Sequence, residues 1–257
     1  MPRFAIATLA IVAAALAGCG GTPEPPPAAQ LVEDVRVAME AAPSFRFEST
    51  WTSTDPREGT NTIEIAGEVS GEDYYAKSDI SGQSAPSYSA ESLVVQGQMY
   101  ERALEFPDDW PDPTAGQWRP SSMSYAELLE RGGSLRKPFL PPEDLGNPVV
   151  TNNSEDDSWL LSGSYPLPDE PGEGNSYSIT PVALWTATVD PKTSRLLTTE
   201  TMIDYGIASY EYGPSGPASG PQSNHLVWRI FDYDADITLT LPPDVTPVPT
   251  ATPEPTA

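Results

Sequence analysis

The stretch that decides the fold is Phe45-Arg46-Phe47-Glu48-Ser49-Thr50-Trp51-Thr52-Ser53. Its aromatic and small side chains alternate with charged and polar ones at a period of two, which is typical of a half-buried strand. Asp55-Pro56-Arg57-Glu58-Gly59 has the composition of a turn, and residues 62–69 then alternate again, with Ile63, Ile65, Gly67 and Val69 on one face. Together these segments predict a long antiparallel hairpin.

The rest of the chain continues this strand pattern. Further strands are predicted at 73–80, 92–95, 99–102, 117–119, 159–165, 182–189, 195–205, 224–233 and 237–241. Many sequential strands separated by short turns favour an antiparallel sheet. Since only one or two helices accompany them, the fold class is expected to be α+β, with the helices on one face of the sheet.

The first helix precedes the hairpin. Leu31, Val35, Ala38 and Met39 share one face at spacings of three and four, and Pro43 ends the pattern. A second helix is predicted at 124–131, because Ser124 and Glu127 have the spacing of a capping box and Gly132-Gly133 follows. An amphipathic helix needs an apolar surface to cover, and the sheet is the available one.

The N-terminus has the features of an export signal. Arg3 precedes an apolar run from Phe4 to Ala17, which is shorter than the roughly 20 residues of a membrane span but suits a signal peptide. Leu16-Ala17-Gly18-Cys19 closes the run, is similar to a bacterial lipobox, and contains the only cysteine. We therefore expect residues 1–18 to be a lipoprotein signal peptide and Cys19 to be lipidated, which places the chain on the extracytoplasmic face of a cell membrane, at the cell surface or in the periplasm. The alternative is a plain secretory signal with a coincidental cysteine.

Composition divides the remaining chain into three parts. Residues 19–29 are the lipidated cysteine and a proline-rich tether, which is expected to be extended and to lift the body off the membrane. Residues 30–241 form one domain, and residues 242–257 are rich in Pro and Thr and are predicted to be disordered. The formal charge of −24 disfavours nucleic acid as a partner, since phosphate backbones are bound by Lys and Arg. It also gives no electrostatic attraction to anionic headgroups.

Candidate catalytic and metal-binding residues are few. His225 is the only histidine and lies in a predicted strand, and the only cysteine is assigned to the lipid. The usual zinc sites need several His or Cys ligands. Asp232-Tyr233-Asp234-Ala235-Asp236 begins like a calcium loop, but Ile237 stands where the glycine is required and Pro243 where the glutamate is required. The sequence therefore predicts no catalytic residue, no metal site, no cofactor and no enzyme activity.

The order of these elements resembles the LolA-like bacterial lipoproteins, and within them the LprG and LppX type. The phrases that carry the resemblance are 93–102, Trp118, 125–129, 184–193 and 228–239. The resemblance implies a curved antiparallel sheet forming a half-barrel, one or two helices on its concave face, and acyl chains bound between them. Residues 134–180 match least, and Ser194 stands where the family usually has glycine.

Two interpretations of the aromatic residues stay open. Trp51, Trp118, Trp159, Trp185 and Trp228 all fall in predicted strands, where they would form either a packed core or the wall of an apolar cavity. The leading hypothesis is an envelope lipoprotein that binds or carries a lipid or another hydrophobic ligand. Its expected cavity residues are Leu31, Val35, Met39, Phe47, Trp51, Ile63, Ile65, Trp185 and Trp228.

Two other hypotheses belong to different classes. The first is a non-catalytic scaffold or protein-interaction module with a filled core, whose protein partner the sequence does not identify. The second is a hydrolase, which requires His225 in a pocket beside a serine and a carboxylate.

Overall fold

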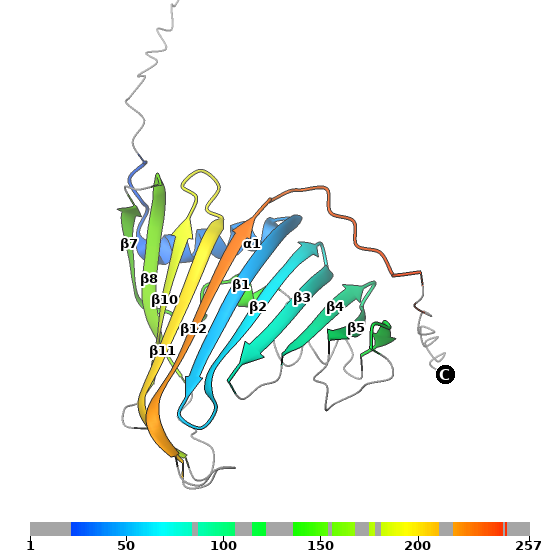
Figure 1. Ribbon diagram of the computed structural model, residues 1–257. Coiled ribbons are helices and arrows are strands. Elements are labelled where there is room, and N and C mark those ends of the chain that lie inside the picture. The colour runs from blue at the N-terminus through cyan, green and yellow to red at the C-terminus, as the bar shows by residue number, and fades with distance from the viewer. Residues whose placement is uncertain are drawn as a thin grey trace, which may run out of the picture.

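The computed structural model describes residues 22–83, 87–105, 115–121, 136–153, 156–167, 175–177, 181–210, 218–243 and 245. These residues form one α-helix, α1 (Ala28–Ala41), one short 3-10 helix, η1 (Lys137–Phe139), and one antiparallel sheet (Figure 1). The first strands are β1 (Ser44–Asp55), β2 (Gly59–Ser70), β3 (Asp73–Gly82), β4 (Tyr88–Val95), β5 (Gln98–Glu105) and β6 (Arg119–Pro120). The others are β7 (Gly146–Asn153), β8 (Ser158–Pro166), β9 (Asn175–Tyr177), β10 (Val182–Val189), β11 (Leu196–Tyr210) and β12 (Ala218–Phe231).

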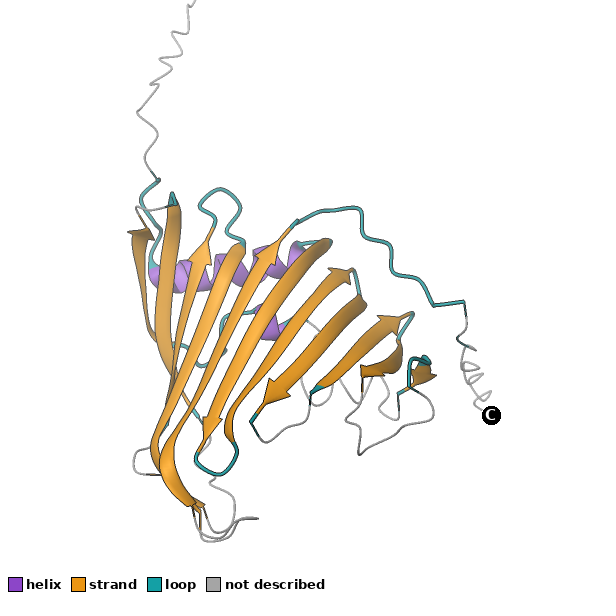
Figure 2. Ribbon diagram, viewed as in Figure 1, coloured by secondary structure: helices purple, strands orange, loops and turns teal. Residues whose placement is uncertain are grey.

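The sheet curls without closing. Its order is β6-β5-β4-β3-β2-β1-β12-β11-β10-β8-β7, and β9 pairs with β11 at the side. Neighbouring strands are mostly consecutive in the chain, but β12 returns to pair with β1 and so joins the two halves. Figure 2 shows the resulting half-barrel with α1 lying across the strands. The predicted curved antiparallel sheet with a helix on its concave face is confirmed, and the described fold is mostly β.

The predicted hairpin is confirmed with its register. Phe47 lies opposite Gly67, Trp51 opposite Ile63 and Asp55 opposite Gly59. Gly67 is required because a Cβ there would lie 2.5 Å from Cζ of Phe47 and 2.3 Å from the Tyr75 carbonyl oxygen. The missing side chain makes room for the Phe47 ring on the concave face of the sheet.

Helix α1 covers one end of the concave face. Leu31, Val35 and Met39 are fully buried there, as the helical spacing predicted. The Phe139 ring of η1 packs edge-on against the ring of Phe45, with 5.1 Å between the ring centroids. The buried residues of this core also include Phe47, Val69, Trp159, Leu161, Trp185, Ala187, Val189, Leu196 and Ile230. Within the described residues, no helix has both the length and the hydropathy needed to cross a membrane.

A second, smaller core lies on the convex face. Leu93, Val95, Tyr100 and Val245 are buried there, and Tyr75, Trp118, Leu239 and Leu241 pack against them. Tyr75 pairs with Leu93, and Leu93 with Tyr100, so these side chains point away from α1. Leu239, Leu241 and Val245 therefore cover the outside of β3–β5.

This arrangement corrects the predicted strand at 237–241. Strand β12 ends at Phe231, and Asp232 and Asp234 have φ angles of 51° and 60°, which turn the chain off the sheet. Residues 235–242 then run over the convex face without ladder pairing. The alternation of Ile237, Leu239 and Leu241 comes from an extended chain that packs one side on that face. A strand paired in a sheet has the same alternation, so the sequence pattern does not distinguish the two.

Other predictions differ from the structure or lie outside it. The edge strand β7 was not predicted, because its two apolar residues, Val149 and Val150, are adjacent and point to opposite faces, which leaves no hydrophobic period. Near Trp118 only Arg119 and Pro120 pair with the sheet. The helix predicted at 124–131, the signal peptide and Cys19 lie outside the described residues, as do residue 244 and residues 246–257.

Candidate functional site

The concave face beyond α1 carries a row of side chains across four neighbouring strands. Trp51 pairs with Leu226 on β12, Leu226 with Thr201 on β11, and Thr201 with Trp185 on β10. Directly opposed residues of antiparallel strands point to the same face. The register therefore places two tryptophans, a leucine and a threonine side by side on the face that α1 covers only in part.

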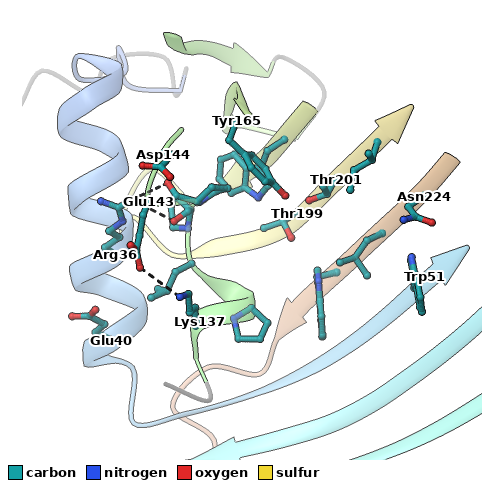
Figure 3. Close-up of a pocket in the computed structure, with 18 residues that line it drawn as sticks. Arg36, Glu40, Trp51, Lys137, Glu143, Asp144, Tyr165, Thr199, Thr201 and Asn224 are labelled. Carbon is teal, nitrogen blue, oxygen red and sulfur yellow. Dashed lines mark hydrogen bonds and ion pairs between the residues drawn. The ribbon is translucent and has the colours of Figure 1, made fainter. Parts of the chain in front are cut away.

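Residues 136–145 form a wall opposite this row. Figure 3 shows the side chains of α1 and of this wall facing Trp51, Thr199, Thr201 and Asn224 of the sheet. The space between them is a pocket of about 660 Å³, within the range of small-molecule binding sites. It is lined by Arg36, Glu40, Trp51, Lys137, Pro138, Leu140, Pro141, Pro142, Glu143, Asp144, Tyr165, Trp185, Thr199, Thr201, Ile203, Asn224, Leu226 and Trp228.

Two arginines fasten the wall to α1. The Arg36 guanidinium donates to the carbonyl oxygen of Pro142 at 2.9 Å and to that of Pro141 at 3.4 Å. Arg136 donates to the carbonyl oxygen of Met39, in the last turn of α1, at 2.7 Å. Proline fixes its own φ angle, so a segment with three prolines has little backbone freedom even before it folds. These hydrogen bonds therefore order the wall at a small entropic cost.

Charge is distributed unevenly around the pocket. The lining residues of the sheet are all uncharged, whereas α1 and the wall contribute Arg36, Glu40, Lys137, Glu143 and Asp144. Lys137 and Glu143 lie 3.7 Å apart as an exposed ion pair. Burial raises the pKa of the Tyr165 hydroxyl above its ordinary value, so this polar group of the floor adds no negative charge to the pocket. The pocket therefore has a neutral, largely aromatic floor and a charged rim.

Asn224 adds an unpaired polar group to the floor. Its side-chain oxygen is buried without a hydrogen-bond partner among the described residues, while its amide nitrogen donates weakly to the Tyr205 hydroxyl at 3.4 Å. Buried polar atoms nearly always have a partner, so this oxygen is an exception among the described residues that line the pocket.

The structure divides the sequence-predicted cavity residues into three groups. Trp51, Trp185 and Trp228 line the pocket. Ile63 and Ile65 lie half-buried on β2, Ile63 opposite Trp51 and Ile65 against the core. The others lie in the filled core below α1: Leu31, Val35, Met39 and Phe47.

The sequence reasoning missed several lining residues. Tyr165, Ile203 and Leu226 alternate in phase with inward-facing residues of their own strands, and this signal was available. The wall carries no such signal, because a proline-rich irregular segment has no period that shows which side it buries.

His225 points to the convex face, away from the pocket. It lies between the inward-facing Asn224 and Leu226, and its Nε2 is hydrogen-bonded to Glu200 at 2.7 Å. The hydrolase hypothesis required this side chain in the pocket, so the geometry does not support it. Asp232 and Asp234 pair with Arg46 and Arg195, and no group of potential metal ligands occurs among the described residues.

Comparisons with known proteins match this chain only at the level of solved structures. No protein-family model and no curated protein matches it. The chain is similar to LprF from Mycobacterium bovis, at 12% identity and a TM-score of 0.44, over 84% of this chain and 96% of that one. It is also similar to the LolA superfamily protein NE2245 from Nitrosomonas europaea, at 12% identity and a TM-score of 0.26, over 84% and 94%.

A third similar structure is DynF from Micromonospora chersina, at 14% identity and a TM-score of 0.16, over 75% of this chain and 80% of that one. One of these structures is described as a LolA superfamily protein, the family that the sequence resembles. At these identities and TM-scores the likeness carries no functional argument, which rests on the pocket itself.

Proposed function

We propose that this protein is an extracytoplasmic lipoprotein, anchored through acyl chains on Cys19, that binds a lipid or another hydrophobic ligand on its concave face. The observation that carries the proposal is the pocket of about 660 Å³ whose floor includes Trp51, Trp185 and Trp228 and no charged residue. Binding and release need no covalent step, so the proposed role is that of a carrier and not of an enzyme.

Burial of apolar surface supplies the affinity. Each Å² of apolar surface removed from water contributes roughly 25 cal/mol, and tryptophan offers a large rigid surface at little entropic cost. The ligand places its apolar part against the neutral floor and its polar end at the charged rim, where Arg36 and Lys137 lie.

The extent of the packed core favours binding over a scaffold role. Where α1 and Phe139 cover the concave face, the space is filled by a packed core that includes Phe45 and Ile230. Two inward-facing pairs further along the strands, the packing among the described residues ends, and Trp51 is 37% exposed although it continues the same alternation. A scaffold module has no need for an uncovered aromatic floor, whereas a ligand site does.

The test is native mass spectrometry of residues 20–257 purified from a lipid-rich bacterial host. We compare Trp51→Asp with Thr50→Asp, because Thr50 is the exposed neighbour on the opposite face of the same strand. The unaltered protein and Thr50→Asp are expected to carry co-purified lipid, and folded Trp51→Asp to lose it. A ligand-free mass for the unaltered protein, with no uptake of added phospholipid, contradicts the proposal.

The anchor is tested separately in the full chain. The N-terminal peptide of the mature protein should carry the mass of acyl chains on Cys19, and Cys19→Ser should move the protein from the membrane fraction to the soluble fraction. Two or more acyl chains hold a protein stably, whereas one does so only reversibly. A membrane-bound Cys19→Ser protein contradicts this part of the proposal.

A further inference from the structure

One part of the convex face lacks charge altogether. Strands β7, β8 and β10 contain no charged residue on either face, in a chain with a formal charge of −24. By contrast, the convex faces of β1 and β2 carry Arg46, Glu48, Glu64 and Glu68, of which Arg46 and Glu68 lie directly opposite each other.

The uncharged region also exposes apolar side chains. Leu184 and Met202 lie directly opposite each other and are 57% and 51% exposed. Val149, Leu160 and Val182 on the same face are also exposed. On β11 the border of this surface is marked by Glu200, which is paired with His225, and by Asp204. We call the five apolar residues the convex patch.

No described segment covers the convex patch. The outside of β3–β5 is covered by Leu239, Leu241 and Val245, whereas among the described residues the convex patch stays exposed. Exposed apolar side chains gathered on one face mark an interaction site.

The N-terminal segment ends beside the same strands. The Trp159 ring N–H, on β8, donates to the carbonyl oxygen of Pro23 at 2.9 Å, and the Thr22 hydroxyl donates to Asp157 at 3.1 Å. Figure 1 shows the chain leaving the body next to β7 and β8. From Thr22 onward the expected tether is therefore docked on the body.

This docking leaves little chain between the body and the lipid. Three residue steps separate Thr22 from Cys19, and they span at most roughly 11 Å even when fully extended. The β7–β8 end of the sheet, where Trp159 holds the N-terminal segment from the concave side, thus stays within that distance of the acyl chains.

We propose that the convex patch rests on the bilayer that holds the anchor. This inference rests on the proposed lipidation of Cys19. The strongly acidic remainder of the surface is repelled by anionic headgroups, whereas the strands of the patch carry no charge to oppose contact. In this orientation the pocket, which opens on the opposite face, points away from the bilayer, and its ligand is exchanged on the solvent side.

The experiment uses the full lipidated chain on phosphatidylcholine vesicles that contain a nitroxide-labelled lipid. Leu184→Cys introduces the single free thiol, because the sulfur of Cys19 is occupied by lipid, and it is labelled with an environment-sensitive fluorophore. Glu64→Cys, on the convex face of β2, is the matched control. The label at 184 should be quenched by the nitroxide lipid and the label at 64 should not.

Vesicle flotation separates this inference from the proposed function. If the chain does not float with vesicles, or its N-terminal peptide lacks acyl chains, the anchor is refuted. If the chain floats and the labels at 184 and 64 are quenched equally, or neither is quenched, only the docking face is refuted. Alternatively, the label at 184 reports an apolar environment without being quenched by the nitroxide lipid, while light scattering shows that the protein is a dimer. That result assigns the face to a second copy of the chain and also overturns the proposal.

Discussion

Trp51 on β1 and Trp185 on β10 lie at the two ends of one row of cross-strand partners, joined by Leu226 and Thr201. The row exists because β12 returns to pair with β1, which brings the two ends of the domain into one sheet. The hydrophobic floor of the pocket therefore depends on the long-range pairing of β1 with β12.

Gly67→Ala tests the close approach of Phe47 to β2. A Cβ at this position meets both the Phe47 ring and a backbone carbonyl, so the ring or the strand must shift. We expect a loss of about 1–3 kcal/mol in the free energy of unfolding, as for overpacked cores, measured by urea denaturation. Ala66→Ser, on the exposed face of the same strand, should change stability little, and an equally stable Gly67→Ala protein contradicts the prediction.

Asp55 makes folding dependent on pH. Burial opposes its ionisation, but hydrogen bonds from Tyr210 and from the backbone N–H of Arg57, with the Arg57 charge, outweigh that effect and hold the pKa of Asp55 below its usual value. A depressed pKa contributes stability that is present above the unfolded-state value of about 3.9 and is lost as the pH falls through the lower folded-state pKa.

Tyr210→Phe should reduce this contribution. The Tyr210 hydroxyl donates to Asp55 at 2.6 Å, and a hydrogen bond to a charged group contributes about 1.5–3 kcal/mol. Urea denaturation from pH 7 to pH 3 should show the variant less stable at pH 7 and the gap narrowing at acid pH. A gap that stays constant with pH would mean that Tyr210 acts through packing alone.

Arg36→Met should release the wall of the pocket. The variant keeps the apolar stem but loses the hydrogen bonds to the carbonyl oxygens of Pro141 and Pro142. Hydrogen exchange at 139–145 should accelerate while the sheet stays protected. Glu33→Gln is the control, since its ion pair with Arg36 is exposed and long at 3.9 Å and such pairs contribute little. Unchanged exchange in Arg36→Met would show that Arg136 and the packing of Phe139 hold the wall without Arg36.

Leu239→Asp tests the cover over β3–β5. Leu239 packs against the buried residues of the convex core, whereas its neighbour Thr240 is exposed. A charge at 239 must be desolvated or the segment must lift off, and we expect a loss of about 1–3 kcal/mol. Thr240→Asp should be nearly neutral. Thermal unfolding of the two variants measures the difference, and equal melting temperatures would refute the packing role of this segment.

The local pattern of the sequence is sufficient for most of the elements, and for the face that the β1–β2 hairpin and helix α1 bury. The alternation around Phe47 and Ile65 fixes which side of the hairpin is buried, and the spacing of Leu31, Val35 and Met39 fixes the buried face of α1. These features follow from side-chain periodicity, which is a property of neighbouring residues. The assignment of Cys19 rests on sequence alone and stays a prediction.

Only the tertiary structure decides what covers each buried face. Phe47 and Trp51 belong to one alternation, yet Phe47 lies under Phe139 while Trp51 faces the pocket, because α1 and η1 reach only part of the strand. Residues 237–241 alternate like a strand but pack across the convex face. Periodicity shows that a side is apolar, whereas the partner on that side comes from distant segments whose contacts no local pattern encodes.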